Sequence, residues 1–166
     1  MKITSHPFGS VDGQTVDLFT LSNDQGMVIK ITNYGGIVTS MVVPDNNGRA
    51  EDIVCGFDTL DGYFSDIYTA NSPYFGCLVG RYAARVKDGK FSIGDIDYQV
   101  DTNDGPNHLH GGVKAFDKRV WTSEVFESNE VVGLKLNLKS PDGDGGYPGN
   151  LDVAVTYSLN NNNEFS

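Results

Sequence analysis

A chain of 166 residues is long enough for one domain with a core, because a domain of this size buries roughly 70% of its unfolded surface. Hydrophobic residues make up 39% and charged residues 20%, with a mean hydropathy of -0.29, which excludes a disordered or membrane-spanning chain. The net charge of -10 repels phosphate backbones and anionic lipids, so we expect no nucleic acid and no membrane as a partner. The first residues lead into no apolar run typical of a secretory signal, which predicts a cytoplasmic protein.

Strand patterns separated by turns fill the first two thirds of the chain. Residues 27–32 and 36–43 are rich in β-branched and aromatic side chains, which predicts two strands. Residues 91–93 and 96–100 flank Gly94-Asp95, where a glycine in the first turn position favours a tight hairpin. No long segment shows apolar residues at helical spacing, so we expect no long helix.

The last third continues the same pattern. Residues 120–126, 133–139 and 151–159 are predicted strands, the last two with strict alternation of apolar and polar side chains. With no linker or internal repeat, residues 1–166 are predicted to belong to a single antiparallel sandwich or barrel. The asparagine run at 160–163 predicts a turn, and residues 164–166 look like the opening of a further strand, so we interpret the chain as ending within a fold. The alternative is a short disordered tail.

Three glycine-rich segments suit a ligand better than a core. Gly105–Gly112 places His108 and His110 one residue apart in a backbone that its glycines make mobile. The other two segments are Gly80–Gly89, which contains two arginines, and Asp142–Gly149. Together these segments predict a sugar as the ligand.

The histidines leave two interpretations open. On a strand, His108 and His110 would point to the same face and could grip a metal ion. No third ligand pattern follows them, since Asp117 is the first carboxylate after the pair. A neutral imidazole that donates to or accepts from a sugar hydroxyl needs no metal, and we favour this interpretation. His6 is interpreted as a structural or surface residue.

Arginine offers five fixed donors, so Arg81 or Arg85 could hold two vicinal hydroxyls of a sugar. The alternative for each is a surface salt bridge, and their spacing of four residues does not choose between them. Asp142 and Asp144 resemble the start of a calcium loop, but Gly146 occupies the third ligand position. That segment is therefore predicted to be a turn.

The two cysteines predict no redox motif and no thiolate zinc site, because no Cys-x-x-Cys occurs. Cys55 and Cys77 both lie in apolar surroundings that suit small buried side chains. A disulfide between them is left open.

Five motifs, in this order and with matching gaps, resemble the aldose 1-epimerase (galactose mutarotase) family. The motifs are Asn33–Gly36, Asp52–Phe57, Val79–Arg85, Leu109–Gly112 and Asp142–Gly149. The resemblance covers nearly the whole chain and implies an all-β protein, an antiparallel β-sandwich of the galactose mutarotase type. It implies no cofactor and no metal, and a hexose such as galactose or glucose as the small-molecule partner.

The resemblance also implies a reaction and two site residues. Family enzymes interconvert the α and β anomers of hexoses by acid/base opening of the ring. By position, Arg85 matches the family's sugar-binding arginine, and His110 matches the first of two active-site histidines, which contacts the sugar and assists charge development. His108 has no such role. Ala84 stands where asparagine is common, which removes a potential polar contact to the sugar.

The larger departure is what these residues lack. The family's second histidine, its catalytic glutamate base and a sugar-binding aspartate match no residue of this chain. We therefore interpret the chain as the N-terminal half of the family fold, inactive alone unless another group supplies the acid and base. Unpaired strand edges and an exposed apolar face would then favour self-association.

Two other interpretations stay open. One is a non-catalytic carbohydrate-binding module that uses Arg85 and His110 with nearby aromatic residues such as Tyr82 and Phe116. The other is a half-protein that a second chain complements, or a truncated one without a role of its own.

Overall fold

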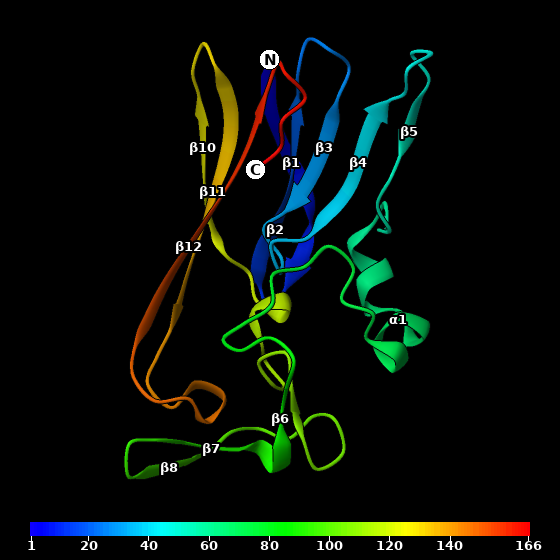
Figure 1. Ribbon diagram of the computed structural model, residues 1–166. Helices are drawn as coiled ribbons and strands as arrows, with labels where there is room; N and C mark the ends of the chain where they lie inside the picture. Colours follow the sequence, from blue (N-terminus) through cyan, green and yellow to red (C-terminus); the bar gives the residue numbers. More distant parts are fainter.

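Two antiparallel sheets face each other in the computed structural model, which describes residues 1–166 (Figure 1). The larger sheet contains, in spatial order, β1 (Lys2–Val11), β2 (Gln14–Ser22), β3 (Val28–Thr32), β4 (Val38–Pro44) and β5 (Ala50–Asp52). The smaller sheet contains β10 (Thr122–Glu127), β11 (Val131–Ser140) and β12 (Leu151–Asn160). This arrangement confirms the predicted all-β antiparallel sandwich. None of the helices is long and apolar enough to cross a membrane.

The core lies between the two sheets. Leu21, Ile29 and Ile31 of the larger sheet and Leu134, Leu136 and Leu159 of the smaller one are all 0% exposed. Alternation along each strand produces this, because every second side chain points to the same face. Trp121 closes one end of the core, and its Nε1–H donates to the carbonyl of Phe116 at 3.1 Å. Burial of these apolar side chains is what holds the two sheets together.

The first two strands were not predicted from the sequence. They form a hairpin in which Val11 pairs with Gln14 across Asp12 and Gly13. Both turn residues have positive φ, 50° and 76°, which is the backbone of a tight type I′ turn. The Asp-Gly pair is itself a strong hairpin signal. The strand before this turn shows no clear alternation of apolar and polar residues, because β1 is mostly exposed at the edge of its sheet.

Two short helices cover the open end of the sandwich near β4, although the sequence predicted none. They are the 3-10 helix η1 (Leu60–Phe64) and α1 (Asp66–Asn71). The hydroxyl of Ser65 caps α1 by accepting from the Tyr68 N–H. Each element is too short to show a helical period. They bury a second, smaller apolar cluster that includes Tyr34, Ile37, Leu60 and Tyr63.

A layer of loops lies below the sandwich in Figure 1 and contains the predicted site residues. It includes β6 (Arg85–Val86), β7 (Lys90–Ile93), β8 (Ile96–Gln99) and β9 (His108–Leu109), with the 3-10 turns η2 (Lys87–Gly89), η3 (Phe116–Lys118) and η4 (Asp144–Gly146). β7 and β8 form the predicted hairpin, in which Ile93 pairs with Ile96 and Gly94 has a φ of 60°. The sandwich thus supplies a rigid base for loops that have little apolar core of their own.

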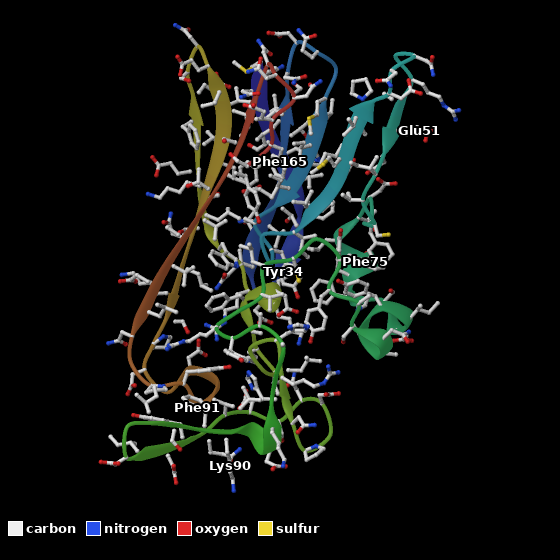
Figure 2. All side chains as sticks on the ribbon, in the orientation of Figure 1. Tyr34, Glu51, Phe75, Lys90, Phe91 and Phe165 are labelled. Atoms are coloured by element: carbon white, nitrogen blue, oxygen red, sulfur yellow. The ribbon has the colours of Figure 1, made fainter.

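The end of the chain turns back along β12. Leu159 pairs with Phe165 in an antiparallel bridge, and Ser158 and Ser166 exchange backbone hydrogen bonds of 2.8 and 3.0 Å. The ring of Phe165, labelled in Figure 2, stacks on that of Tyr157 with centroids 5.8 Å apart. This confirms the prediction of an asparagine turn followed by the start of a further strand. A disordered tail is the wrong interpretation.

We propose that residues 1–166 unfold as one unit, and Leu134→Ala tests this. The side chain of Leu134 is fully buried between the sheets, so its truncation is expected to cost about 2–5 kcal/mol of unfolding free energy. Guanidinium unfolding followed by tryptophan fluorescence and by circular dichroism should shift together. Val125→Ala, at a position 50% exposed on β10, is the matched control and should change little. Non-coincident transitions would contradict a single unit.

Candidate functional site

The two predicted site residues lie on segments that pair with each other. β6 and β9 are antiparallel, with Arg85 opposite Leu109. One step further, the N–H of His110 donates to the carbonyl of Ala84 at 3.1 Å. The structure therefore places Arg85 and His110 on adjoining rungs of one short ladder, although 25 residues separate them in the chain.

A backbone hydrogen bond defines the state of the His110 ring. The N–H of Ala84 donates to His110 Nδ1 at 3.0 Å. A backbone amide can only donate, so Nδ1 is unprotonated and the neutral ring carries its proton on Nε2. Nε2 makes no hydrogen bond in the structure, so its N–H can donate to a ligand. Because this bond comes from the backbone, the side chain at Ala84 is not required for it.

Arg81 and Arg85, both candidates for a sugar-binding arginine from the sequence, have different surroundings in the structure. Arg81 donates to the Ser140 hydroxyl and to the carbonyls of Ser140, Pro141 and Pro148, and it lies over the Tyr147 ring. Those contacts use most of its donors, so Arg81 holds loops together. Arg85 has a side chain that is 62% exposed, and its one polar contact is a 2.6 Å ion pair with Asp104. Arg85 is thus the arginine with donors free for a ligand.

The two histidines likewise have different environments. His108 is 0% exposed, and its Nδ1–H donates to the carbonyl of Asp101 at 2.7 Å. Its Nε2 then accepts from the hydroxyl of Tyr147 at 2.6 Å. Since both ring nitrogens are occupied, His108 cannot bind a metal together with His110. No group of three or more histidine, cysteine, aspartate or glutamate side chains could hold a metal ion.

Close backbone approach explains why glycines surround His110. A Cβ on Gly111 would lie 1.7 Å from the carbonyl oxygen of Gly80, so no other residue fits there without displacing one of the two loops. Asn103 fastens the same loop from the other side. Its side chain accepts from the Leu109 N–H at 2.7 Å and donates to the Leu109 carbonyl at 2.9 Å. The loop that presents His110 is therefore held in one conformation.

Backbone strain gathers beside this loop. Tyr74, Ala84 and His110 have φ values of 56°, 69° and 52°, which side-chain-bearing residues adopt at a cost. The ring centroids of Tyr74 and His110 lie only 4.7 Å apart, at an interplanar angle of 69°. Strained residues of this kind are enriched at functional sites. Tyr74 is a neighbour of His110 that the sequence did not reveal.

Tyr74 also lines a cavity of about 260 Å³. Its walls include the aromatic residues Tyr34, Tyr63, Phe64, Tyr68 and Tyr74, with Cys77 and Asp117. Figure 2 shows Tyr34 and Phe75 at this level, at the lower end of the sandwich. Burial raises the pKa of the Cys77 thiol to about 12, so this cysteine is unreactive at neutral pH.

Asp117 is the unusual polar group of this cavity. Its Oδ1 is buried and has no hydrogen-bond partner. Burial is the main reason that its pKa lies above the ordinary value of 3.8, and nearby Lys118 partly opposes the shift. The sequence contained no sign of this, because the charged run Asp117-Lys118-Arg119 is typical of a solvated surface.

Several sequence interpretations change at this point. Phe116 is 7% exposed and packs edge-on against Trp121, so it belongs to the core and offers no platform for a sugar. Cys55 is exposed, which corrects its predicted burial, and both cysteines are free. The reason is that Cys55 follows the edge strand β5, where apolar neighbours lie outside the sandwich. Tyr82 is 51% exposed, as a ligand contact requires.

The Asp142–Gly149 segment is a turn, as predicted. The carboxylate of Asp142 accepts from the Gly149 N–H, and the carboxylate of Asp144 accepts from the Ser140 hydroxyl and pairs with Arg119. Both carboxylates are therefore used within the fold, which leaves neither free for calcium.

Residues 17–166 match the protein family described as aldose 1-epimerase. The chain belongs to this family. It is 42% identical over 161 residues to the galactose mutarotase of Bos taurus, and 32% identical over 155 residues to the aldose 1-epimerase of Escherichia coli strain K12. These matches cover 96% and 93% of this chain but only 44% and 42% of the two relatives.

Solved structures agree with the sequence comparison. The crystal structure of galactose 1-epimerase from Lactobacillus acidophilus NCFM superimposes with a TM-score of 0.84 at 31% identity. The superposition covers 96% of this chain and 45% of the Lactobacillus acidophilus chain. The chain thus spans somewhat less than half the length of the family members that it matches.

Asp117→Asn should change how stability depends on pH. A raised folded pKa means that the folded state binds the proton of Asp117 more tightly than the unfolded state does, so the contribution of this group to stability is complete below pH 3.8 and is lost as the pH rises through the folded value. Asparagine removes this dependence. We expect the denaturant concentration at the unfolding midpoint of the variant to rise relative to that of the wild type as the pH increases from 3.8 to neutrality.

Denaturant unfolding at a series of pH values measures the effect. Asp61→Asn, at an exposed position of η1, is the matched control and should follow the wild-type curve. Parallel pH curves for Asp117→Asn and the wild type would show that the buried carboxyl does not influence stability.

Proposed function

We propose that this chain binds a hexose such as galactose or glucose through Arg85 and His110 and contributes these two side chains to anomer interconversion. The supporting observation is the pair of unused donors on adjoining rungs: the Nε2–H of His110 and the exposed guanidinium of Arg85. Membership of the aldose 1-epimerase family gives the reaction class. Neither donor requires a cofactor or metal.

The chemistry needs two coordinated proton transfers. A base takes the proton of the C1 hydroxyl while an acid protonates the ring oxygen, after which the open aldehyde rotates about C1–C2 and closes on its other face. The Nε2–H of His110 can donate to a sugar oxygen where negative charge develops. Arg85 can hold neighbouring hydroxyls with its planar donors, and its ion pair with Asp104 orients the guanidinium.

These residues do not make a complete acid/base pair. Asp104 is engaged by Arg85, and Asp117 lines an aromatic cavity together with Tyr74. We therefore propose that the 166-residue chain binds the sugar but turns it over slowly or not at all alone. A purely carbohydrate-binding role is the second candidate, because Asp104 is paired with Arg85 and the carboxyl of Asp117, although near His110, is buried.

Calorimetric titration with galactose tests the binding residues. His110→Ala and Arg85→Ala should each weaken binding by roughly tenfold, because each removes hydrogen bonds worth about 1–3 kcal/mol. The matched controls are His6→Ala and Arg49→Ala; His6 lies on the exposed strand β1, and Arg49 pairs with Glu51 far from the loop layer. Unchanged titrations for both site variants would remove the assignment.

Polarimetry of freshly dissolved α-D-galactose tests turnover. We expect the wild-type chain to leave the spontaneous rate unchanged. An acceleration that disappears in His110→Ala would show that the chain, alone or assembled, supplies both an acid and a base.

A further inference from the structure

A single hydrogen bond holds the imidazole of His110 in its observed orientation. The N–H of Ala84 donates to Nδ1 at 3.0 Å, and Nε2 has no partner. A neutral hydrogen bond of this kind favours one state over another by roughly two- to tenfold. Rotation of the ring about its Cβ–Cγ bond would carry Nδ1 away from the Ala84 amide. This bond alone would therefore leave a sizeable fraction of the rings turned away.

The ring of Tyr74 supplies a second contact. Its centroid lies 4.7 Å from that of the His110 ring, at an interplanar angle of 69°. Edge-to-face geometry is favoured between aromatic rings, and it contributes a further preference of roughly two- to tenfold beyond the burial of the two rings. The contact restricts rotation of the imidazole, while the Ala84 amide selects the nitrogen that faces it. The two contacts together favour the observed ring state by roughly ten- to a hundredfold.

The segment that contains Tyr74 is anchored on both the sheet and the helix. The Gly76 carbonyl accepts from the Val38 N–H of β4 at 3.0 Å, and a Cβ on Gly76 would lie 2.3 Å from the Val38 carbonyl oxygen. Phe75, labelled in Figure 2, packs edge-on against a ring of α1 with centroids 5.6 Å apart. These contacts hold Tyr74 at a φ of 56°, and strain maintained in this way is enriched at functional sites.

We propose that Tyr74 is a positioning residue for His110: its ring holds the imidazole so that Nδ1 stays on the Ala84 amide and Nε2–H is free for the ligand. This role rests on the proposed function, in which Nε2–H donates to a sugar oxygen. Tyr74 acts through His110 and exchanges no proton with the sugar. The Tyr74 hydroxyl makes no hydrogen bond within the chain, so the ring carries the effect and phenylalanine would serve equally well.

NMR of the histidine ring nitrogens at about pH 8, where histidine side chains are neutral, tests the proposal. In the wild type, the His110 ring should be protonated at Nε2. A ring released from the Ala84 amide can carry its proton on either nitrogen. Tyr74→Leu should therefore raise the fraction of His110 protonated at Nδ1 by roughly two- to tenfold. Tyr74→Phe keeps the ring and should match the wild type.

Two controls separate this effect from a loss of structure. His108 is the internal reference, because its buried ring donates from Nδ1 and should give the same signals in every folded variant. Phe64→Leu is the matched control variant. Phe64 lines the same cavity as Tyr74, is 47% exposed, and packs against Tyr34. Its loss should leave the His110 signals unchanged.

Galactose titration of the same variants separates this proposal from the proposed function. Tyr74→Leu should weaken binding by roughly two- to tenfold, and Tyr74→Phe should bind like the wild type. A wild type that binds no galactose would overturn the proposed function, and the ring signals would still decide whether Tyr74 positions His110. Wild-type His110 signals in Tyr74→Leu would overturn the positioning role. So would an equal change of these signals in Tyr74→Phe or Phe64→Leu.

Discussion

The buried ring of His108 is the contact on which the loop layer depends. It joins the carbonyl of Asp101 to the hydroxyl of Tyr147, and so ties β9 to the segment after β8 and to the turn that contains Tyr147, which is 39 residues away in the sequence. Removing one partner would leave a buried polar group unsatisfied, which costs about 1–3 kcal/mol. Because β9 also presents His110, the position of the free imidazole follows from that of the buried one. The His-x-His motif therefore combines one fully buried histidine and one partly buried histidine whose Nε2–H makes no hydrogen bond within the chain.

The sandwich and the loop layer are stabilised by different physical means. Aliphatic side chains from the two sheets hold the sandwich together, and this requires only alternation along the strands. The loops instead use close glycine contacts, side-chain amides such as Asn103, and the guanidinium of Arg81. A layer built from short polar contacts can place donors such as Arg85 in solvent, which an aliphatic core cannot do.

This division explains what the sequence could predict. Strict alternation predicted β11 and β12, and β-branched and aromatic content predicted β3, β4 and β10. The Gly94-Asp95 turn predicted the hairpin of β7 and β8. β1 was missed because as an exposed edge it has no apolar period, and the Asp12-Gly13 turn was the signal that could have revealed it. The short helices escaped because one or two turns show no period.

The site was only partly readable for a different reason. From their residue type and spacing, Arg81 and Arg85 are equally good candidates for the sugar-binding arginine. Only the tertiary contacts of Arg81 with Ser140 and its neighbours show that Arg81 has a structural role. Tyr74 and Asp117 come near His110 by folding, not by spacing. Family resemblance pointed to Arg85 and His110, while the backbone bond from Ala84 that selects the His110 tautomer could be seen only in three dimensions.

The complete enclosure of His108 has a consequence for solvent exchange. Its Nδ1 proton is donated to a carbonyl and shielded from water on all sides, so it can exchange with solvent only when the loop layer opens. The lifetime of that single proton would therefore report the opening of the loop layer that lies below the sandwich in Figure 1.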